Sequence, residues 1–261
     1  MRRGFTLLEV IFVIVIMGVL SKFGVEVLYT TYENYIYSNT YNKLAGRSEL
    51  ALKQIANRLQ YRIKDLTIAR IDKSGQAIAI GDASETTLKD ATVLEWVGID
   101  IDGWRSTGTP TWSGLVDLNN LFTNKDSLAS PNSNAGKGAV FFIGSDVEVK
   151  GDGAWFNAMQ AVDITGNALV SDFGGQDVFE FYQFSKSAYA IELKDRTLTL
   201  YSNYAPWSGE TMKNGQILME NVTTFQFRSL GDTMLIQLCV GDNNLTLENK
   251  EYSICKEKVV F

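Results

Sequence analysis

The sequence contains no histidine, two cysteines and three prolines among its 261 residues. The lack of imidazole excludes a Ser-His or Cys-His nucleophile pair, a His-ligated zinc and the usual general base near neutral pH. Basic residues number 24 against 30 acidic ones, which gives a formal net charge of −6. Nucleic-acid affinity depends on a basic excess, so we expect no nucleic-acid partner. The composition therefore disfavours conventional hydrolase chemistry and DNA or RNA binding.

A long apolar run stands at the start of the chain. Residues 5–25 are mostly apolar, and two arginines, Arg2 and Arg3, precede them. As a helix rising 1.5 Å per residue, this run spans roughly 31 Å, about one bilayer core. The positive-inside rule keeps the short arginine-containing head in the cytoplasm. The pattern predicts one membrane-spanning helix, with everything after residue 25 exported.

Glu9 distinguishes this run from an ordinary secretory signal peptide. An unpaired carboxylate inside a membrane costs a few kcal/mol or more, so Glu9 needs a partner. No A-x-A cleavage site follows Leu20. The stretch R-G-F-T-L-L-E-V at 3–10 resembles the prepilin-type signal of type IV pilins and type II secretion pseudopilins. A plain membrane anchor with a misplaced glutamate is the alternative.

The resemblance implies a defined processing route. A prepilin peptidase would cut after Gly4, and the same enzyme would N-methylate Phe5, the new N-terminus. The apolar helix is retained, and Glu9 would pair with the amine of a neighbouring subunit's Phe5 as subunits stack into a filament. The mature chain would have 22 basic and 30 acidic residues, a net charge of −8. The helix-kinking proline that the family often carries near the end of the run is absent.

Location and partners also follow from the resemblance. It implies a single-pass bacterial inner-membrane protein with a cytoplasmic N-terminus, a periplasmic domain, and a place in a periplasmic or extracellular filament. The expected partners are the prepilin peptidase, other pilin or pseudopilin subunits, an inner-membrane assembly platform and membrane lipid. We expect no catalytic residue and no cofactor.

The helical pattern continues beyond the apolar run. Residues 26–63 contain no proline and one glycine, and apolar or small residues recur there every three or four positions. This predicts an amphipathic continuation over 26–65, helical to about Arg62. The predicted buried face holds Leu44, Ser48, Leu52, Ile55, Leu59 and Ile63, while Lys43, Arg47, Lys53, Asn57 and Arg58 fall largely off it.

Short alternating runs with turn residues between them predict β-structure beyond residue 66. The run at 92–101 places Val93, Glu95 and Val97 on one face and predicts a half-buried strand. Asp-Asn-Asn at 242–244 predicts a hairpin turn. Further strands are predicted at 66–71, 76–80, 138–143, 178–185, 188–193, 197–201, 216–220, 222–229, 234–240 and 251–260, with a tight hairpin through 194–196.

The predicted fold class is α+β, a long N-terminal helix packed on a mostly antiparallel β-sheet domain, similar to a pilin. Residues 102–137 are rich in Gly, Ser, Thr and Asn, and predict a loop insertion with a short helix near 117–122. The expected organisation is a leader at 1–4, a membrane and filament-core helix at 5–25, its continuation at 26–65, and an exported domain at 66–261.

Two sets of residues are candidates for a local site. Cys239 and Cys255 lie 16 positions apart on neighbouring predicted strands of an exported domain, which favours a disulfide. Asp146, Glu148 and Asp152 offer the oxygen ligands that calcium prefers, but their spacing does not fit an EF-hand loop. Solvated turn carboxylates are the favoured interpretation, and we expect no metal.

The stretch ILMENVTTFQF at 217–227 resembles strands of J-type minor pseudopilins and W-type minor pilins. Major subunits are usually much shorter, so size also favours a minor subunit. The leading hypothesis is a minor pseudopilin of type II secretion, with a minor pilin of a type IV pilus as the alternative. A membrane-tethered binding protein or enzyme is the alternative of another class.

Overall fold

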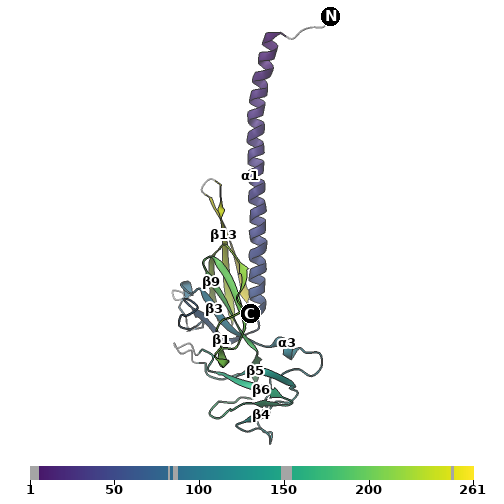
Figure 1. The fold of residues 1–261 in the computed structure, drawn as a ribbon, viewed down its shortest axis with the longest axis vertical. Coiled ribbons are helices and arrows are strands. Elements are labelled where there is room, and N and C mark those ends of the chain that lie inside the picture. The colour runs from purple at the N-terminus through teal and green to yellow at the C-terminus, as the bar shows by residue number, and fades with distance from the viewer. Residues whose placement is uncertain (1–5, 82, 85–87, 148–154, 248–249) are drawn as a thin grey trace. The chain divides into compact units, whose positions relative to one another are not determined.

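The computed structural model describes residues 6–81, 83–84, 88–147, 155–247 and 250–261, with only the backbone described over 242–247 and 250–252. Its contacts divide the chain into two compact units, Met1–Gly46 and Arg47–Phe261. Helix α1, Leu7–Leu59, belongs to both, and antiparallel strands build most of the second unit (Figure 1). The predicted α+β class, a long N-terminal helix with an antiparallel sheet domain, is confirmed.

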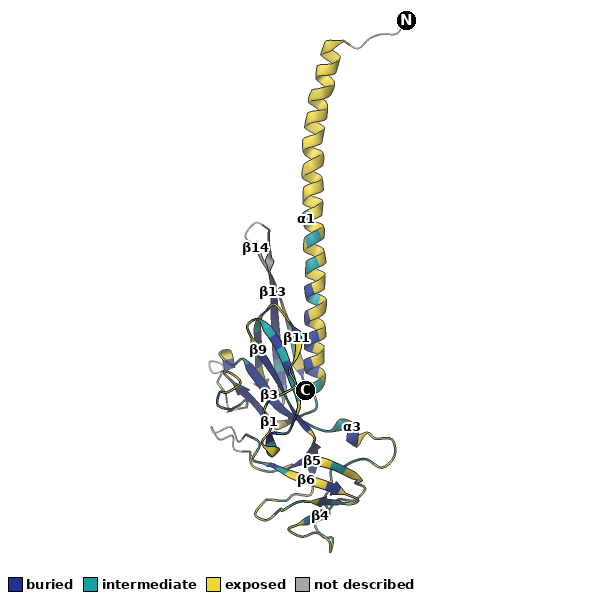
Figure 2. Ribbon diagram, viewed as in Figure 1, coloured by how far each residue is buried: buried dark blue, intermediate teal, exposed yellow. Residues whose placement is uncertain are grey.

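In the first unit, α1 exposes apolar side chains around its whole circumference (Figure 2). The exposed fractions of its large apolar residues up to Leu28 run from 47% at Val10 to 81% at Leu7. The most apolar 18-residue window has a mean hydropathy of 2.3, so the helix is long and apolar enough to cross a membrane. A surface of this kind is stable only when lipid or other apolar side chains cover it.

Three antiparallel sheets make up the described part of the second unit. Their strand orders are β11-β10-β9-β3-β1-β2, β12-β13-β14 and β4-β7-β6-β5-β8. The strands of the first half are β1 Arg62–Arg70, β2 Ile78–Ala79, β3 Val93–Gly98, β4 Ser127–Ala129, β5 Ala135–Phe142, β6 Met159–Thr165 and β7 Ala168–Val170. Those of the second half are β8 Tyr182–Ser185, β9 Ser187–Lys194, β10 Thr197–Tyr204, β11 Gln216–Met219, β12 Val222–Leu230, β13 Thr233–Leu247 and β14 Lys250–Val260. Two short helices, α3 Ile101–Trp104 and the 3-10 turn η1 Pro206–Ser208, connect them.

The part of α1 in the second unit is amphipathic, as the sequence predicts. Ser48, Leu52, Ile55 and Leu59 are all buried, and the polar residues predicted to fall off this face are exposed or half-buried. On the outer side the Glu49 carboxylate accepts a hydrogen bond from the Lys256 ammonium of β14 at 2.7 Å. This ion pair lowers the pKa of Glu49, because the lysine favours the charged carboxylate.

The helix ends earlier than its sequence period predicts, at Leu59 and not near Arg62. The Tyr61 carbonyl already accepts a hydrogen bond from the Ile99 N–H at 2.8 Å, at the end of β3. The Arg62 guanidinium donates to the Leu59 carbonyl at 3.0 Å, which satisfies one of the free carbonyls at the helix end. Sheet pairing therefore overrides the local helical pattern.

Strand β3 is buried on both faces, so the predicted half-buried strand is wrong. Val93 and Val97 belong to a core between the six-stranded and five-stranded sheets. Leu94 and Trp96 point to the opposite face and are fully buried as well. A second core covers the other face of the five-stranded sheet, with Trp112, Val116, Leu128, Val140, Phe142, Val162, Ile164, Leu169, Phe173, Tyr182 and Phe184 as its buried members.

The region 102–137 departs from the predicted loop with a helix near 117–122. It contains turns at 117–122, then β4 and the start of β5. The Asp117 carboxylate accepts a hydrogen bond from the Asn119 N–H at 3.1 Å, and the Asp117 carbonyl accepts one from the Thr123 hydroxyl at 2.7 Å. Such local side-chain bonds compete with helix formation and stabilise turns. Strands β6 and β7 were not predicted at all.

The two predicted hairpin turns have different outcomes. Lys194 ends β9 and Thr197 begins β10, with Asp195 and Arg196 at φ values of 48° and 61° between them. Positive φ at both central residues is the type I′ geometry, which matches strand twist, so this prediction is confirmed. The turn predicted at 242–244 is wrong, because β13 continues to Leu247.

A disulfide joins Cys239 of β13 to Cys255 of β14, which are directly paired across the ladder. Replacing both cysteines by serine should lower the free energy of unfolding by about 3 kcal/mol, the chain-entropy value for a loop of this length. Thermal unfolding of the full chain in a mild detergent measures the loss, and the reduced wild-type protein is the control. Equal melting temperatures for oxidised and reduced wild-type protein would contradict the stabilising role.

Candidate processing and assembly site

Helix α1 begins immediately after Thr6, at the predicted processing site. The Thr6 carbonyl accepts hydrogen bonds from the Glu9 N–H at 3.1 Å and the Val10 N–H at 3.3 Å. The Thr6 hydroxyl also lies 3.4 Å from the Glu9 nitrogen, which donates to it. Threonine followed three residues later by glutamate is the pattern of a capping box, which starts a helix at a fixed residue. Gly4 and Phe5 lie outside the described residues.

Glu9 lies in the first turn of α1 and is exposed. Among the described residues no cation forms an ion pair with it. Its nearest helical neighbours are apolar and exposed, so the carboxylate stands on a surface that lipid or another helix must cover. Wherever that surface is buried the carboxylate needs a partner, and the described residues of this chain supply no cation for it.

Comparisons with known proteins agree with this segment. Residues 1–21 match the family described as the Prokaryotic N-terminal methylation motif. A search of curated proteins and a search of solved structures both found no match. The motif supports a type IV pilin-like protein, and implies processing by a prepilin peptidase and assembly with other pilins. The apolar helix that follows fits a single-pass membrane anchor.

Of the three calcium candidates, the structure describes only Asp146. Asp146 is exposed and lines a small pocket of 250 Å³, while Glu148 and Asp152 lie outside the described residues. Within the described parts of the chain, no group of three or more acidic or cysteine side chains is placed to hold a metal ion.

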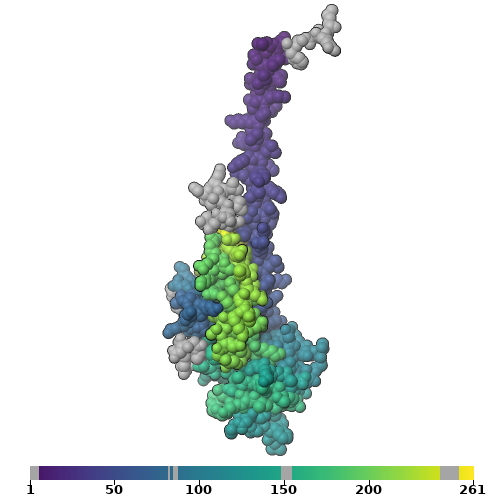
Figure 3. Space-filling model, in the orientation of Figure 1, coloured from purple at the N-terminus to yellow at the C-terminus, as the bar shows by residue number. Residues whose placement is uncertain are grey.

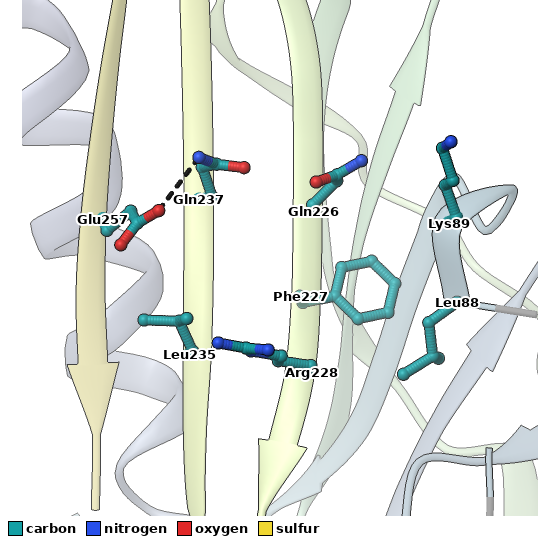
Figure 4. A pocket seen from close by; sticks show the side chains of 8 residues that line it. All are labelled: Leu88, Lys89, Gln226, Phe227, Arg228, Leu235, Gln237 and Glu257. Carbon is teal, nitrogen blue, oxygen red and sulfur yellow. Dashed lines mark hydrogen bonds between the residues drawn. The ribbon is translucent and has the colours of Figure 1, made fainter. Parts of the chain in front are cut away.

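A larger hollow of 460 Å³ lies on the outer face of the three-stranded sheet (Figure 4). Leu88 and Phe227 are buried at its base, and the amides of Gln226 and Gln237 line it beside Glu257. Gln237 donates a hydrogen bond to the Glu257 carboxylate at 2.9 Å, so the one acidic group is already engaged. The hollow offers hydrogen-bonding groups, and its described lining holds no nucleophile beside a base. The sequence alternation did not reveal it, because Leu88 comes from a separate segment.

A buried polar cluster lies in the core between the two larger sheets. Glu95, 3% exposed, accepts a hydrogen bond from Arg70 Nε at 2.9 Å and one from the Tyr204 hydroxyl at 2.8 Å. Burial raises the pKa of Glu95, against the opposing effects of Arg70 and Tyr204. Beside them the Tyr201 hydroxyl donates to Glu192 at 2.7 Å, and burial together with this bond raises the pKa of Tyr201 to about 12. Each carboxylate is paired, which is the pattern of a structural network.

Processing at Gly4 has a direct readout. We expect the mature protein to have the mass of residues 5–261 plus one methyl group, measured by intact mass spectrometry. Gly4→Leu should retain residues 1–4, because the peptidase site is lost. Gly18→Leu is the matched control, since open space surrounds Gly18 and its position lies beyond the cleavage site. Retention of Met1 in the wild type, or cleavage near Ser21, would contradict this processing.

The raised pKa of Glu95 predicts a pH dependence of stability. The folded protein binds the proton of Glu95 more tightly than the unfolded chain does, so the protonated carboxyl stabilises the fold at pH values below its ordinary pKa of 4.5. This stabilisation is lost as the pH rises through the raised pKa of the folded state. Glu95→Gln cannot ionise, so its unfolding free energy should rise relative to wild type between pH 4.5 and neutral pH. Thermal unfolding across this range measures the difference. Exposed Glu220→Gln is the control, and a difference that stays constant with pH would contradict the prediction.

Proposed function

We propose that this chain is a minor pseudopilin of a type II secretion system, a structural subunit that assembles through α1 into a periplasmic pseudopilus. The main support is one carboxylate, Glu9, at the start of an apolar helix whose large apolar residues up to Leu28 are all exposed in the described part of the chain. Side-by-side packing of such helices replaces lipid contact, and pairing of Glu9 with the amine of another subunit's Phe5 fixes the register. The methylation motif at 1–21 supports the pilin-like class.

In this proposal the leader at 1–4 faces the cytoplasm, the helix at 5–25 spans the inner membrane and the domain at 66–261 is periplasmic. Arg2 and Arg3 support this orientation under the positive-inside rule. An exported domain also suits the disulfide between Cys239 and Cys255. The assembly platform of the inner membrane would extract the processed subunit into the filament.

A minor pilin of a type IV pilus has the same requirements for α1 and Glu9. Deleting the gene in the source bacterium separates the two functions. Loss of exoprotein secretion with intact surface pili supports the pseudopilin assignment. Loss of pili or of twitching with normal secretion supports the pilin assignment and overturns ours.

Glu9→Ala tests assembly directly. We expect the variant to be cleaved and to stay in the membrane, while the filament fraction falls about a hundredfold. The reason is that a buried amine without its carboxylate partner costs about 3 kcal/mol or more. Cross-linking of membranes followed by immunoblotting measures that fraction, and Glu26→Ala, an exposed glutamate further along α1, is the control.

The outcome separates the structural role from a tethered binding protein or enzyme. Normal assembly of the cleaved Glu9→Ala protein would refute the pairing role. The membrane-tethered class would be favoured by a protein that is monomeric after detergent extraction and by Glu9→Ala and Glu26→Ala variants with the same filament fraction as the wild type.

A further inference from the structure

The acidic charge of the chain is concentrated in one lobe of the second unit. Residues 111–185 contain nine acidic and three basic residues, a net charge of −6 that equals the formal charge of the whole chain. Most of this segment gathers around the five-stranded sheet, coloured teal in Figure 3. Lys125 and Lys137 already pair with Asp126 and Asp163, at 2.8 and 3.2 Å. The other carboxylates described in this lobe, apart from Asp126 and Asp163, give the lobe a strongly negative charge.

A row of exposed apolar side chains lies next to the buried core on the same lobe. Phe141 of β5 is buried, with 2% of its surface exposed, while Ile143, the first residue after β5, is 50% exposed. The Ile143 N–H donates to the Phe181 carbonyl at 2.9 Å, and Phe181 pairs in turn with Leu115. Phe181 and Leu115 are 57% and 41% exposed. Ile143, Phe181 and Leu115 thus form a row of three exposed apolar side chains at the edge of the buried core.

A fourth apolar side chain and a small acidic pocket adjoin this row. The Phe179 ring, 37% exposed, lies over Gly144, which follows Ile143 directly. Asp146 and Asp177 line the same pocket of 250 Å³, and its other described lining residues are uncharged. Asp146 lies three residues after Ile143 in the sequence, and Asp177 lies two residues before Phe179. Apolar side chains and acidic groups therefore lie together, and among the described residues no lysine or arginine forms an ion pair with Asp146 or Asp177.

We propose that this surface, Leu115, Ile143, Phe179 and Phe181 with Asp146 and Asp177, binds a segment of a partner protein that presents apolar side chains beside a lysine or arginine. The apolar side chains cover the row, and the cation enters the pocket between the two carboxylates. Charge complementarity of this kind speeds association and selects partners. The same charge repels an anionic lipid surface, which excludes that occupant. The proposal does not depend on filament assembly through α1.

A peptide probe tests the proposal on the full chain in nanodiscs of zwitterionic lipid. A fluorescent ten-residue peptide of alternating leucine and lysine should bind, measured by anisotropy against empty nanodiscs. The matching leucine–glutamate peptide should bind at least about tenfold more weakly. Ile143→Ser and Phe181→Ser should each weaken binding about tenfold, the usual effect of removing a central interface residue. The double variant Asp146→Asn with Asp177→Asn should also weaken binding about tenfold. It should remove the dependence of peptide affinity on salt concentration.

Ile217→Ser is the matched control, because Ile217 on β11 is 63% exposed and outside the row. Equal binding of both peptides, or an equal effect of Ile217→Ser, would overturn the proposal in favour of non-specific apolar contact. Release of the bound peptide by millimolar calcium at constant ionic strength would also overturn it, because the pocket would then be a cation site. Circular dichroism of each variant verifies that the fold is intact.

Discussion

The apolar side chains of α1 between Leu7 and Leu28 cannot remain in water, and this requirement governs the rest of the molecule. A membrane satisfies it before assembly, and neighbouring helices satisfy it afterwards. In the proposed assembly, Glu9 would make the two environments unequal, because its carboxylate finds no partner in hydrocarbon and would find one between subunits. The second unit carries its own cores, its own disulfide and its own paired buried charges.

Within the second unit, the five-stranded sheet is the element that links stability to surface recognition. One of its faces packs on the six-stranded sheet and the other on the loops around Trp112. Where the cover of the first face ends, Ile143 and Phe181 reach solvent beside acidic residues. Strand β5 thus buries Phe141 in the core, and the residue that follows the strand, Ile143, reaches the surface.

The sequence revealed the elements whose signal is local. The period of Ser48, Leu52, Ile55 and Leu59 predicted the buried helix face, and the short connection at 194–196 predicted the type I′ hairpin. It failed where distant pairing decides the outcome. Glu95 looked like one member of an alternating strand, but Arg70 and Tyr204, far apart in the chain, allow it to be buried. Residues 242–244 resemble a turn, yet their strand continues because β14 pairs with it.

The candidate sites divide in the same way. The motif around Gly4 and Glu9 can be recognised without a structure because it is a short contiguous segment within residues 1–21. The acidic apolar surface could not be found from sequence, because Leu115, Ile143 and Phe181 become neighbours only through strand pairing.

The cap at Thr6 has a consequence for the order of events during maturation. The described hydrogen bonds that start α1 begin at Thr6, two residues beyond Gly4, so cutting after Gly4 breaks none of them. In the proposed processing, the cut would leave a positive amine one residue before the cap, at the positive end of the helix dipole, where a cation is disfavoured by about 0.3–1 kcal/mol. Under the proposed processing, proteolysis would therefore give the membrane anchor a terminal amine that is stabilised by an anion, and Glu9 of an adjacent chain would supply that anion.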